Sequence, residues 1–298
     1  SAFDILLGGE RLDKDARREL MKFRTYCEEY INLEELTGCR LELAPLYSHV
    51  SAERMADEER CRLGLKSEPI RDIFSLMELN GCRVIRQPIP EESQISGVFI
   101  HLEEKEASFA LINSTLSPGQ QVFTAAHEYG HYLKDRSEDA IIDNPDIFVD
   151  EFLSLYHPRE KFAQVFAAQF LMPPSKVSEI IDKDFRSGKL RFENVICLKR
   201  YFGVSFFDML RTLKKLEYLS TSKFEEYLQL DPDFHEEALF GNLEDERGPK
   251  RRKGKPVVSD RFRALAIKAF QRKKISAEKL SGLLNQDKDK LVLLLAKS

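Results

Sequence analysis

The sequence predicts an α+β fold in which a small antiparallel sheet lies among many helices. Two observations favour this class: several long segments repeat apolar residues at helical spacing, and two short β-branched runs flank a turn-prone acidic segment. The chain has 298 residues, of which 42% are hydrophobic and 32% are charged. That length can bury a sizeable core, and the composition excludes collagen-like and wholly disordered proteins.

Helices are predicted wherever apolar residues recur every three or four positions and a breaker follows. In residues 13–37, Leu20, Phe23 and Cys27 begin such a series and Gly38 ends it. The other predicted helices follow the same rule: 51–64, 69–80, 120–134, 158–172, 192–201, 206–217, and two or three short helices after residue 257.

Strands are predicted in the first half of the chain, where Val, Ile and Phe are frequent. Cys82–Ile89 reads as one strand that a proline stops. Residues 95–102 and 108–113 flank Glu103–Glu106 and predict a β-hairpin, whose free edge could bind an extended peptide by β-augmentation. The acidic stretch 135–146 is predicted to be a loop.

Charge is distributed unevenly along the chain. Residues 247–298 carry 16 Lys and Arg against 4 acids, whereas residues 1–246 carry 30 against 46. The basic residues are densest between Arg247 and Lys255. This stretch is either a solvated linker or a phosphate-binding arm, because clustered cations release counterions from nucleic acid. The residues that would contact nucleic acid are Lys250, Arg251, Arg252, Lys253 and Lys255.

Cysteine usage and the termini indicate the compartment. The chain has five cysteines and no CxxC pair, so a disulfide framework is not expected. The first 20 residues are crowded with charge and are not a signal peptide, and no apolar run approaches the ~20 residues that span a bilayer. We therefore expect a cytoplasmic protein that does not associate with membranes.

The strongest chemical signal is the HExxH sequence His127–His131. Histidines at positions i and i+4 of a helix project from one face, so both imidazoles can reach one zinc ion. Zinc lowers the pKa of a bound water molecule to about 7, and Glu128 is placed to take the proton as general base. The helix is slim at Ala125, Ala126 and Gly130, which favours a position deep in a core.

A catalytic zinc site needs a third protein ligand. The best candidate is Glu160, because the small residues Ala163 and Ala167 on the same helix would let it approach the histidine helix closely. Three alternatives lie just upstream: Asp150, Glu151 and His157. Two imidazoles and a carboxylate favour zinc but do not exclude manganese.

At His127–His131, and at Glu160 with the Phe166–Pro173 segment, the chain resembles the ImmA/IrrE metallopeptidase family. That family has the pattern HExGH followed by a helix like ExxAxxFAxxLLMP, and Phe170 is a small departure from it. The resemblance implies a zincin-like fold. It also implies that His127, His131 and Glu160 hold zinc and that Glu128 is the general base.

The resemblance also implies a domain order. The segment from Arg263 to Ser276 resembles the C-terminal tail of members that carry an N-terminal XRE-type helix-turn-helix. Residues 1–38 resemble the end of that arrangement, so we expect an upstream DNA-binding domain to be missing. The expected units are a helical linker (1–40), a zincin-like peptidase domain (41–185), a helix-turn-helix-like segment (186–240), a basic linker (241–256) and a C-terminal helical segment (257–298).

The implied function is site-specific cleavage of a small helix-turn-helix transcriptional repressor, which derepresses stress-response, mobile-element or anti-phage genes. A CapP-like protease paired with a small repressor is the anti-phage version. The alternative is a DNA-responsive regulator whose metal site is structural. It rests on residues 192–217 and on the basic tail, and the two functions coexist if DNA is the trigger. However, Val204, Phe206 and Leu210 are so apolar that we expect them to pack on the peptidase core.

A regulatory protease has to be quiet until it is triggered. One physical route is a thiolate that takes the open zinc position, and Cys39, in a loop-like context after Gly38, is the candidate for this inhibitory ligand. Cys61 is a rival. Alternatively, each of these two cysteines is a small buried apolar residue with no role in regulation.

Overall fold

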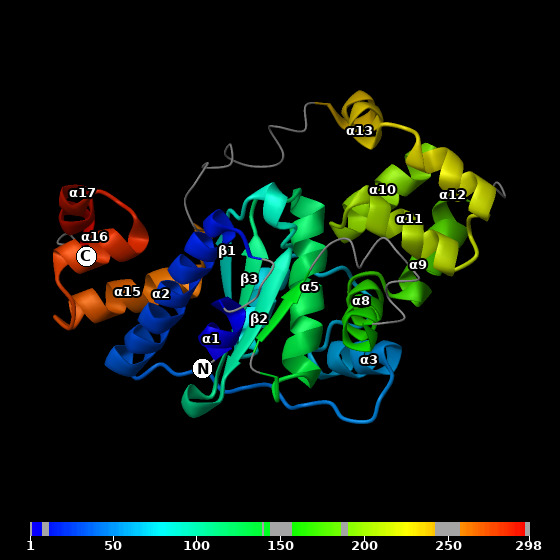
Figure 1. Cartoon of the computed structure of the whole chain (residues 1–298). Helices are drawn as coiled ribbons and strands as arrows, with labels where there is room; N and C mark the ends of the chain where they lie inside the picture. Colours follow the sequence, from blue (N-terminus) through cyan, green and yellow to red (C-terminus); the bar gives the residue numbers. More distant parts are fainter. Residues whose placement is uncertain are drawn as a thin grey trace.

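The computed structural model describes residues 2–7, 12–138, 140–143, 157–185, 190–241 and 257–295. Within them a five-stranded sheet in the order β4-β2-β3-β1-β5 separates two layers of helices (Figure 1). The strands are β1 (Cys82–Gln87), β2 (Gly97–Leu102), β3 (Ala107–Asn113), β4 (Ala140–Asp143) and β5 (Val257–Val258). The predicted α+β class is confirmed.

The sheet is mixed, so the prediction of an antiparallel sheet is wrong for one pair of strands. β2 and β3 form the predicted antiparallel hairpin, but β1 pairs with β3 in parallel. The reason is the order of the strands, because β3 lies between β1 and β2 in the sheet. The chain turns back from β2 into β3, so β3 is antiparallel to β2 and runs in the same direction as β1. A second correction concerns the predicted loop 135–146, because its short apolar run forms β4 and pairs antiparallel with β2.

Most of the helices lie on the side of the first face, and only some of them contact the sheet itself (Figure 1). Val84, Phe99 and Ala110 point to this face and join one apolar core with α5 and α8. The helices of this layer are α3 (Ala52–Arg62), α4 (Ile73–Leu79), α5 (Pro118–Lys134), α8 (Pro158–Leu171), α9 (Pro174–Asp184), α10 (Phe192–Phe202), α11 (Phe206–Lys215), α12 (Thr221–Leu228) and α13 (Pro232–Phe240).

The second face is covered by helices from both ends of the described chain. Ile85, Ile100 and Phe109 point to this face, as the alternation of side chains along a strand requires. The helices of this layer are α1 (Ala2–Leu7), α2 (Lys14–Thr37), α15 (Asp260–Gln271), α16 (Ala277–Leu284) and α17 (Lys288–Leu295). In Figure 1 they lie on the side of the sheet opposite α5 and α8.

Local signals explain where the helices begin and end. Asp13 caps the first turn of α2, and Gly38 ends the helix with a φ of 62°. The helix predicted at 69–80 is shorter, because Asp72 accepts a hydrogen bond from the backbone of Ser75 and starts α4 there. The other predicted helices are confirmed, and the C-terminal segment has three.

The helix-turn-helix-like pair α10–α11 packs on the first-face core, as predicted. Val204, Phe206 and Leu210 are buried in the first-face core. Gly119 in the first turn of α5 lies against this turn so closely that an added Cβ would be 2.4 Å from the backbone nitrogen of Ser205. None of the helices in the described ranges combines the length and the apolarity needed to cross a membrane.

Candidate metal centre

Helix α5 places both histidines of the HExxH sequence in the interior. Ser117 and Gln120 form a reciprocal capping box and Pro118 occupies the first turn, so the start of the helix is fixed. His127 and His131 then project from one face, one turn apart, and both are fully buried. Their Nε2 atoms are 3.1 Å apart.

The carboxylate of Glu160 on α8 meets the two imidazoles. Its Oε2 lies 3.1 Å from Nε2 of His127, and its Oε1 lies 3.6 Å from Nε2 of His131. Ligand atoms bound at about 2.0–2.1 Å around a tetrahedral zinc ion are about 3.3 Å from one another. The donor set and its spacing therefore fit one zinc ion, and these three residues form a buried group able to hold a metal.

Small residues allow α8 to approach α5 closely. A Cβ at Gly130 would lie 3.0 Å from Cδ1 of Phe166 and 3.4 Å from Cα of Ala163. Even an alanine at Gly130 would require Phe166 to move by a few tenths of an ångström, so the two helices are packed as closely as a glycine allows. The slim helix predicted from the sequence has this geometric consequence.

Asp135 is a residue of the site that the sequence interpretation missed. Its Oδ2 lies 2.8 Å from Nδ1 of His131, the ring nitrogen opposite the one that faces Glu160. A carboxylate in this position fixes the tautomer and the orientation of a metal-binding histidine. The signal was present in the sequence, because Asp135 continues the four-residue spacing of His127 and His131.

Glu128 lies beneath strand β2 rather than in solvent. It is fully buried, and a Cβ added to Gly97, the first residue of β2, would come within 1.9 Å of its Oε1. Gly97 has no left-handed φ, so its role is to provide space for this carboxylate. Gly97 is the second residue that the sequence interpretation missed, and no motif in the sequence marks it.

The other candidate ligands lie elsewhere. His157 is exposed and is the residue before α8, whereas Asp150 and Glu151 are outside the described residues. His101 was not among the predicted ligands; it lies on β2, where its Nδ1 is 2.8 Å from the Ser108 hydroxyl. Burial, with a contribution from nearby Arg136, lowers the pKa of His101.

The structure does not bring Cys39 to the metal centre, so its predicted role as an inhibitory ligand is corrected. Cys39 packs in the core of the opposite sheet face, where its Sγ lies 2.9 Å from Nζ of Lys268. Hydrogen bonds from Lys268 and to Thr37 lower the pKa of this thiol. Cys61, the rival, is exposed at the end of α3. The predicted nucleic-acid-binding residues Lys250, Arg251, Arg252, Lys253 and Lys255 lie outside the described residues.

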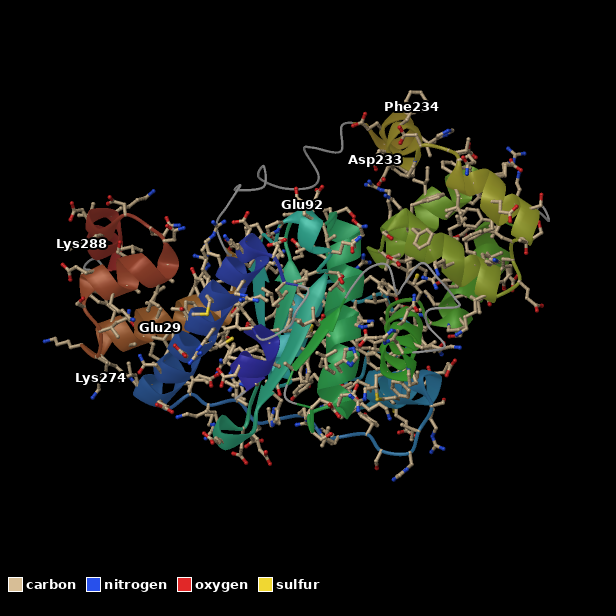
Figure 2. All side chains as sticks on the ribbon, in the orientation of Figure 1. Glu29, Glu92, Asp233, Phe234, Lys274 and Lys288 are labelled. Atoms are coloured by element: carbon tan, nitrogen blue, oxygen red, sulfur yellow. The ribbon has the colours of Figure 1, made fainter. Side chains whose placement is uncertain are left out.

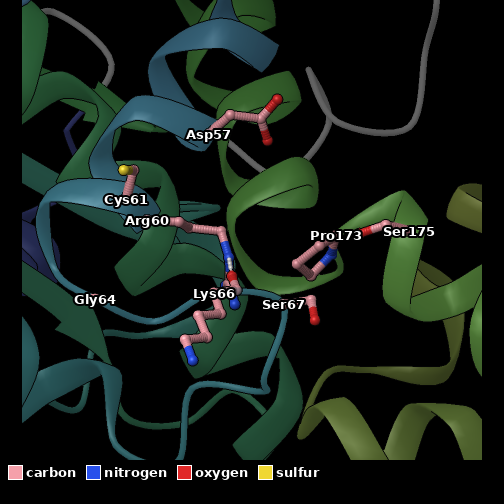
Figure 3. A pocket seen from close by; sticks show the side chains of 8 residues that line it. All are labelled: Asp57, Arg60, Cys61, Gly64, Lys66, Ser67, Pro173 and Ser175. Carbon is pink, nitrogen blue, oxygen red and sulfur yellow. Dashed lines mark hydrogen bonds between the residues drawn. The ribbon is translucent and has the colours of Figure 1, made fainter.

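A separate hollow lies between α3 and the start of α9 (Figure 3). Its main polar group is Arg60, whose guanidinium donates hydrogen bonds to the backbone oxygens of Lys66, Glu68 and Phe170. These contacts tie α3 to the end of α8. The guanidinium therefore stabilises the fold, and His127, His131 and Glu160 do not line this hollow.

Comparison with known proteins agrees with this geometry. Residues 78–214, which include the whole metal centre, match the family model described as the IrrE N-terminal-like domain. A segment of 86 residues is 33% identical to the "Radiation response metalloprotease IrrE" of Deinococcus radiodurans. The aligned part covers 29% of this chain and 26% of that protein, so the match spans about a quarter of the length of the relative.

Proposed function

We propose that this chain, whose residues 78–214 match the IrrE N-terminal-like domain, is a zinc-dependent endopeptidase of the ImmA/IrrE kind that cleaves a transcriptional repressor. One observation carries the peptidase proposal. Two imidazoles and a carboxylate from two helices converge at 3.1–3.6 Å, directly beside a buried glutamate from the same helix turn.

The chain's residues divide the chemistry among them. Zinc, when bound, polarises a peptide carbonyl and lowers the pKa of water to about 7. Three side chains supply metal ligands: His127, His131 and Glu160. The described cluster offers no fourth ligating side chain. Glu128 takes the proton of the attacking water and returns it to the leaving amine. Asp135 holds the His131 ring in the tautomer that presents Nε2 to the metal.

The match to the IrrE N-terminal-like domain supports a protein substrate, and the basic segment of the sequence supports a nucleic-acid trigger. The relative in Deinococcus radiodurans is named a radiation response metalloprotease. We propose a small helix-turn-helix repressor as the substrate. Cleavage would derepress stress, mobile-element or anti-phage genes. The cations between residues 250 and 255 would bind the DNA that triggers cleavage.

The test is incubation of the purified chain with the small helix-turn-helix protein encoded beside its gene. We expect one cut, identified by mass spectrometry, that a chelator abolishes and that added zinc restores. DNA should stimulate the cut, and rising salt should weaken the stimulation. Intact repressor under all of these conditions would contradict the proposal.

Glu128→Gln separates catalysis from a structural role of the metal. The amide keeps the size of the side chain but cannot accept the proton. We therefore expect cleavage to be at least about a thousandfold slower, as when other groups that act in the transition state are removed, and the zinc content to be unchanged. If the chain is instead a DNA-responsive regulator with a structural metal site, Glu128→Gln should leave its response to DNA unchanged, and the wild-type chain should not cut the repressor.

A further inference from the structure

The metal centre is closed to solvent in this structure. His127, Glu128 and His131 are fully buried, and Glu160 is 9% exposed. Side chains fill the space between α5 and α8, which pack against each other (Figure 2). Reacting atoms have to come within about 3–3.5 Å of one another, so a peptide bond can reach this centre only if part of the chain moves.

The strand that lies over the general base is β2, and its outer edge is already paired. We expected this edge to be free for an extended peptide, but β4 pairs antiparallel with Gly97–Ile100 (Figure 1, the bright green arrow beside β2). The register places Asp143 opposite Gly97, the residue that provides space for Glu128. An antiparallel substrate strand would make the same kind of backbone ladder with β2, so β4 occupies the position that β-augmentation requires.

β4 is held less firmly than the interior of the sheet. Every residue of β3 is buried, whereas Ala140, Ile141 and Ile142 of β4 are each partly exposed. β4 has four residues, and within the described ranges it pairs with one strand, β2, and also contacts the six-residue helix α1. Elements with few buried apolar contacts open locally at a lower free energy than the core does.

β4 competes with a substrate because it belongs to the same chain. Residues 135–139 are all that separates the end of α5 at Lys134 from the start of β4 at Ala140. A segment on so short a connection is present at its site at an effective concentration of about millimolar. A substrate strand binds to the fraction of molecules in which β4 has left β2, so its apparent affinity falls in proportion to that fraction.

We propose that β4 is an autoinhibitory strand, which keeps the metal centre closed until a substrate strand takes its place on β2. The inhibition rests on the proposed function, because it concerns the access of a protein substrate to that same site. The opening of β4 is a property of the fold and can be measured without cleavage. This contact would supply the quiet state for which the sequence suggested a cysteine ligand.

Hydrogen exchange of the full, metal-loaded chain, followed residue by residue by NMR, measures whether β4 opens. The backbone amides of β2 point alternately to β4 and to β3, so both kinds can be compared within one strand. We expect the amides that point to β4 to exchange at least about a hundredfold faster than those that point to β3. Equal protection of the two kinds would overturn the proposal, because β4 would then open only when the whole sheet opens.

A disulfide between the two strands tests whether β4 has to leave β2. Val98 and Ile142 are opposite each other and belong to the core of the second face, away from the metal centre. Val98→Cys with Ile142→Cys, once oxidised, should cut the repressor at least about tenfold more slowly, and a phosphine reductant should restore the rate. Ile85→Cys with Val258→Cys places the same bond at the opposite edge of the sheet, between β1 and β5, and should leave the rate unchanged.

The opposite change should speed cleavage. Ile142→Ser removes an apolar side chain of β4 from the core of the second face, so β4 is unpaired in more molecules. The rate at limiting substrate should then rise several-fold. Ile267→Ser on α15 is the matched control, because Ile267 is partly buried in the same core, and the rate should not change.

Full-speed cleavage by the oxidised Val98→Cys, Ile142→Cys chain would overturn the proposal, because the substrate would then bind while β4 stays in place. Equal loss of activity in the control with the disulfide between β1 and β5 would do the same, as would slower cleavage by Ile142→Ser. If the reduced chains and the wild type cut no repressor, the peptidase proposal fails instead, and hydrogen exchange still decides whether β4 opens.

Discussion

The two faces of the sheet bury charge in different ways. On the second face, Arg83 of β1 is fully buried and its guanidinium pairs with Glu34 of α2 at 2.6 and 3.1 Å. Arg261 of α15 reaches the same carboxylate at 2.6 Å. On the first face, α5 and α8 bring two imidazoles together with the carboxylates of Asp135 and Glu160, and Glu128 is buried on the same helix, a donor set that suits a metal cation.

This difference separates a stabilising cluster from a functional one. The Arg83–Glu34–Arg261 cluster contains its own opposite charges and joins the N-terminal and C-terminal helices across one core. The α5–α8 cluster is made of metal-ligating types at ligand spacing. Neutralising one member of each cluster should therefore affect stability in the first case and metal binding in the second.

The largest expected effect is on the second face. Glu34→Gln leaves the buried guanidinium of Arg83 and the partly exposed guanidinium of Arg261 without their carboxylate, and should lower the free energy of unfolding by about 3–5 kcal/mol. Zinc content per folded molecule should not change. Chemical denaturation and metal analysis measure the two quantities. Arg24→Gln, which removes the exposed partner of Glu28, should cost less than about 0.5 kcal/mol and is the matched control.

Glu160→Gln is the counterpart on the first face. It removes one of three ligands, so zinc should be lost to a mild chelator, while the unfolding free energy of the metal-free protein should change by less than about 1 kcal/mol. If Glu160→Gln destabilised the metal-free protein as much as Glu34→Gln does, the two clusters would have the same structural role and the comparison would fail.

Gly97→Ala tests the position of the general base. The added methyl would lie within 1.9 Å of Oε1 of Glu128, so the carboxylate must move away from β2. A displacement of about 1 Å costs around a hundredfold in rate, and zinc content should be retained. Gly282→Ala is the control, because nothing lies within 4 Å of the added atom. Normal cleavage by Gly97→Ala would contradict the role given to Gly97.

The sequence predicted the elements better than their arrangement. The α5 and α8 helices, the hairpin and the convergence of Glu160 on the histidine helix followed from local spacing and small residues. The parallel pairing of β1 with β3 and the strand β4 depend on long-range contacts that no local pattern encodes. The role of Gly97 was not predicted for the same reason, because its neighbour Glu128 is 31 residues away in the chain.

Asp135→Asn should weaken metal binding without abolishing it. The amide can still contact Nδ1 of His131, but it loses the negative charge that raises the basicity of the ring and selects its tautomer. We expect zinc affinity to fall about 10- to 100-fold in a competition with a fluorescent chelator. Unchanged affinity would show that the His131 ring is oriented by its packing alone, and Asp135 would then be a helix-terminating residue with no part in the site.

The smallest expected effect concerns a carboxylate on the first face that burial leaves poorly compensated. Burial is the largest cause that raises the pKa of Asp208, at the start of α11, from 3.8 to about 6. The folded protein therefore binds more protons than the unfolded chain between these pH values, and its stability falls as the pH rises through this window.

Asp208→Asn keeps an oxygen that can accept the hydrogen bond from Ser205 but carries no charge. Its unfolding free energy should match the wild type near pH 4 and exceed it by on the order of 1–2 kcal/mol at pH 7.5. An advantage of Asp208→Asn that is the same at both pH values would mean that the substitution acts through helix propensity or packing, and that the carboxylate is not destabilised by its burial.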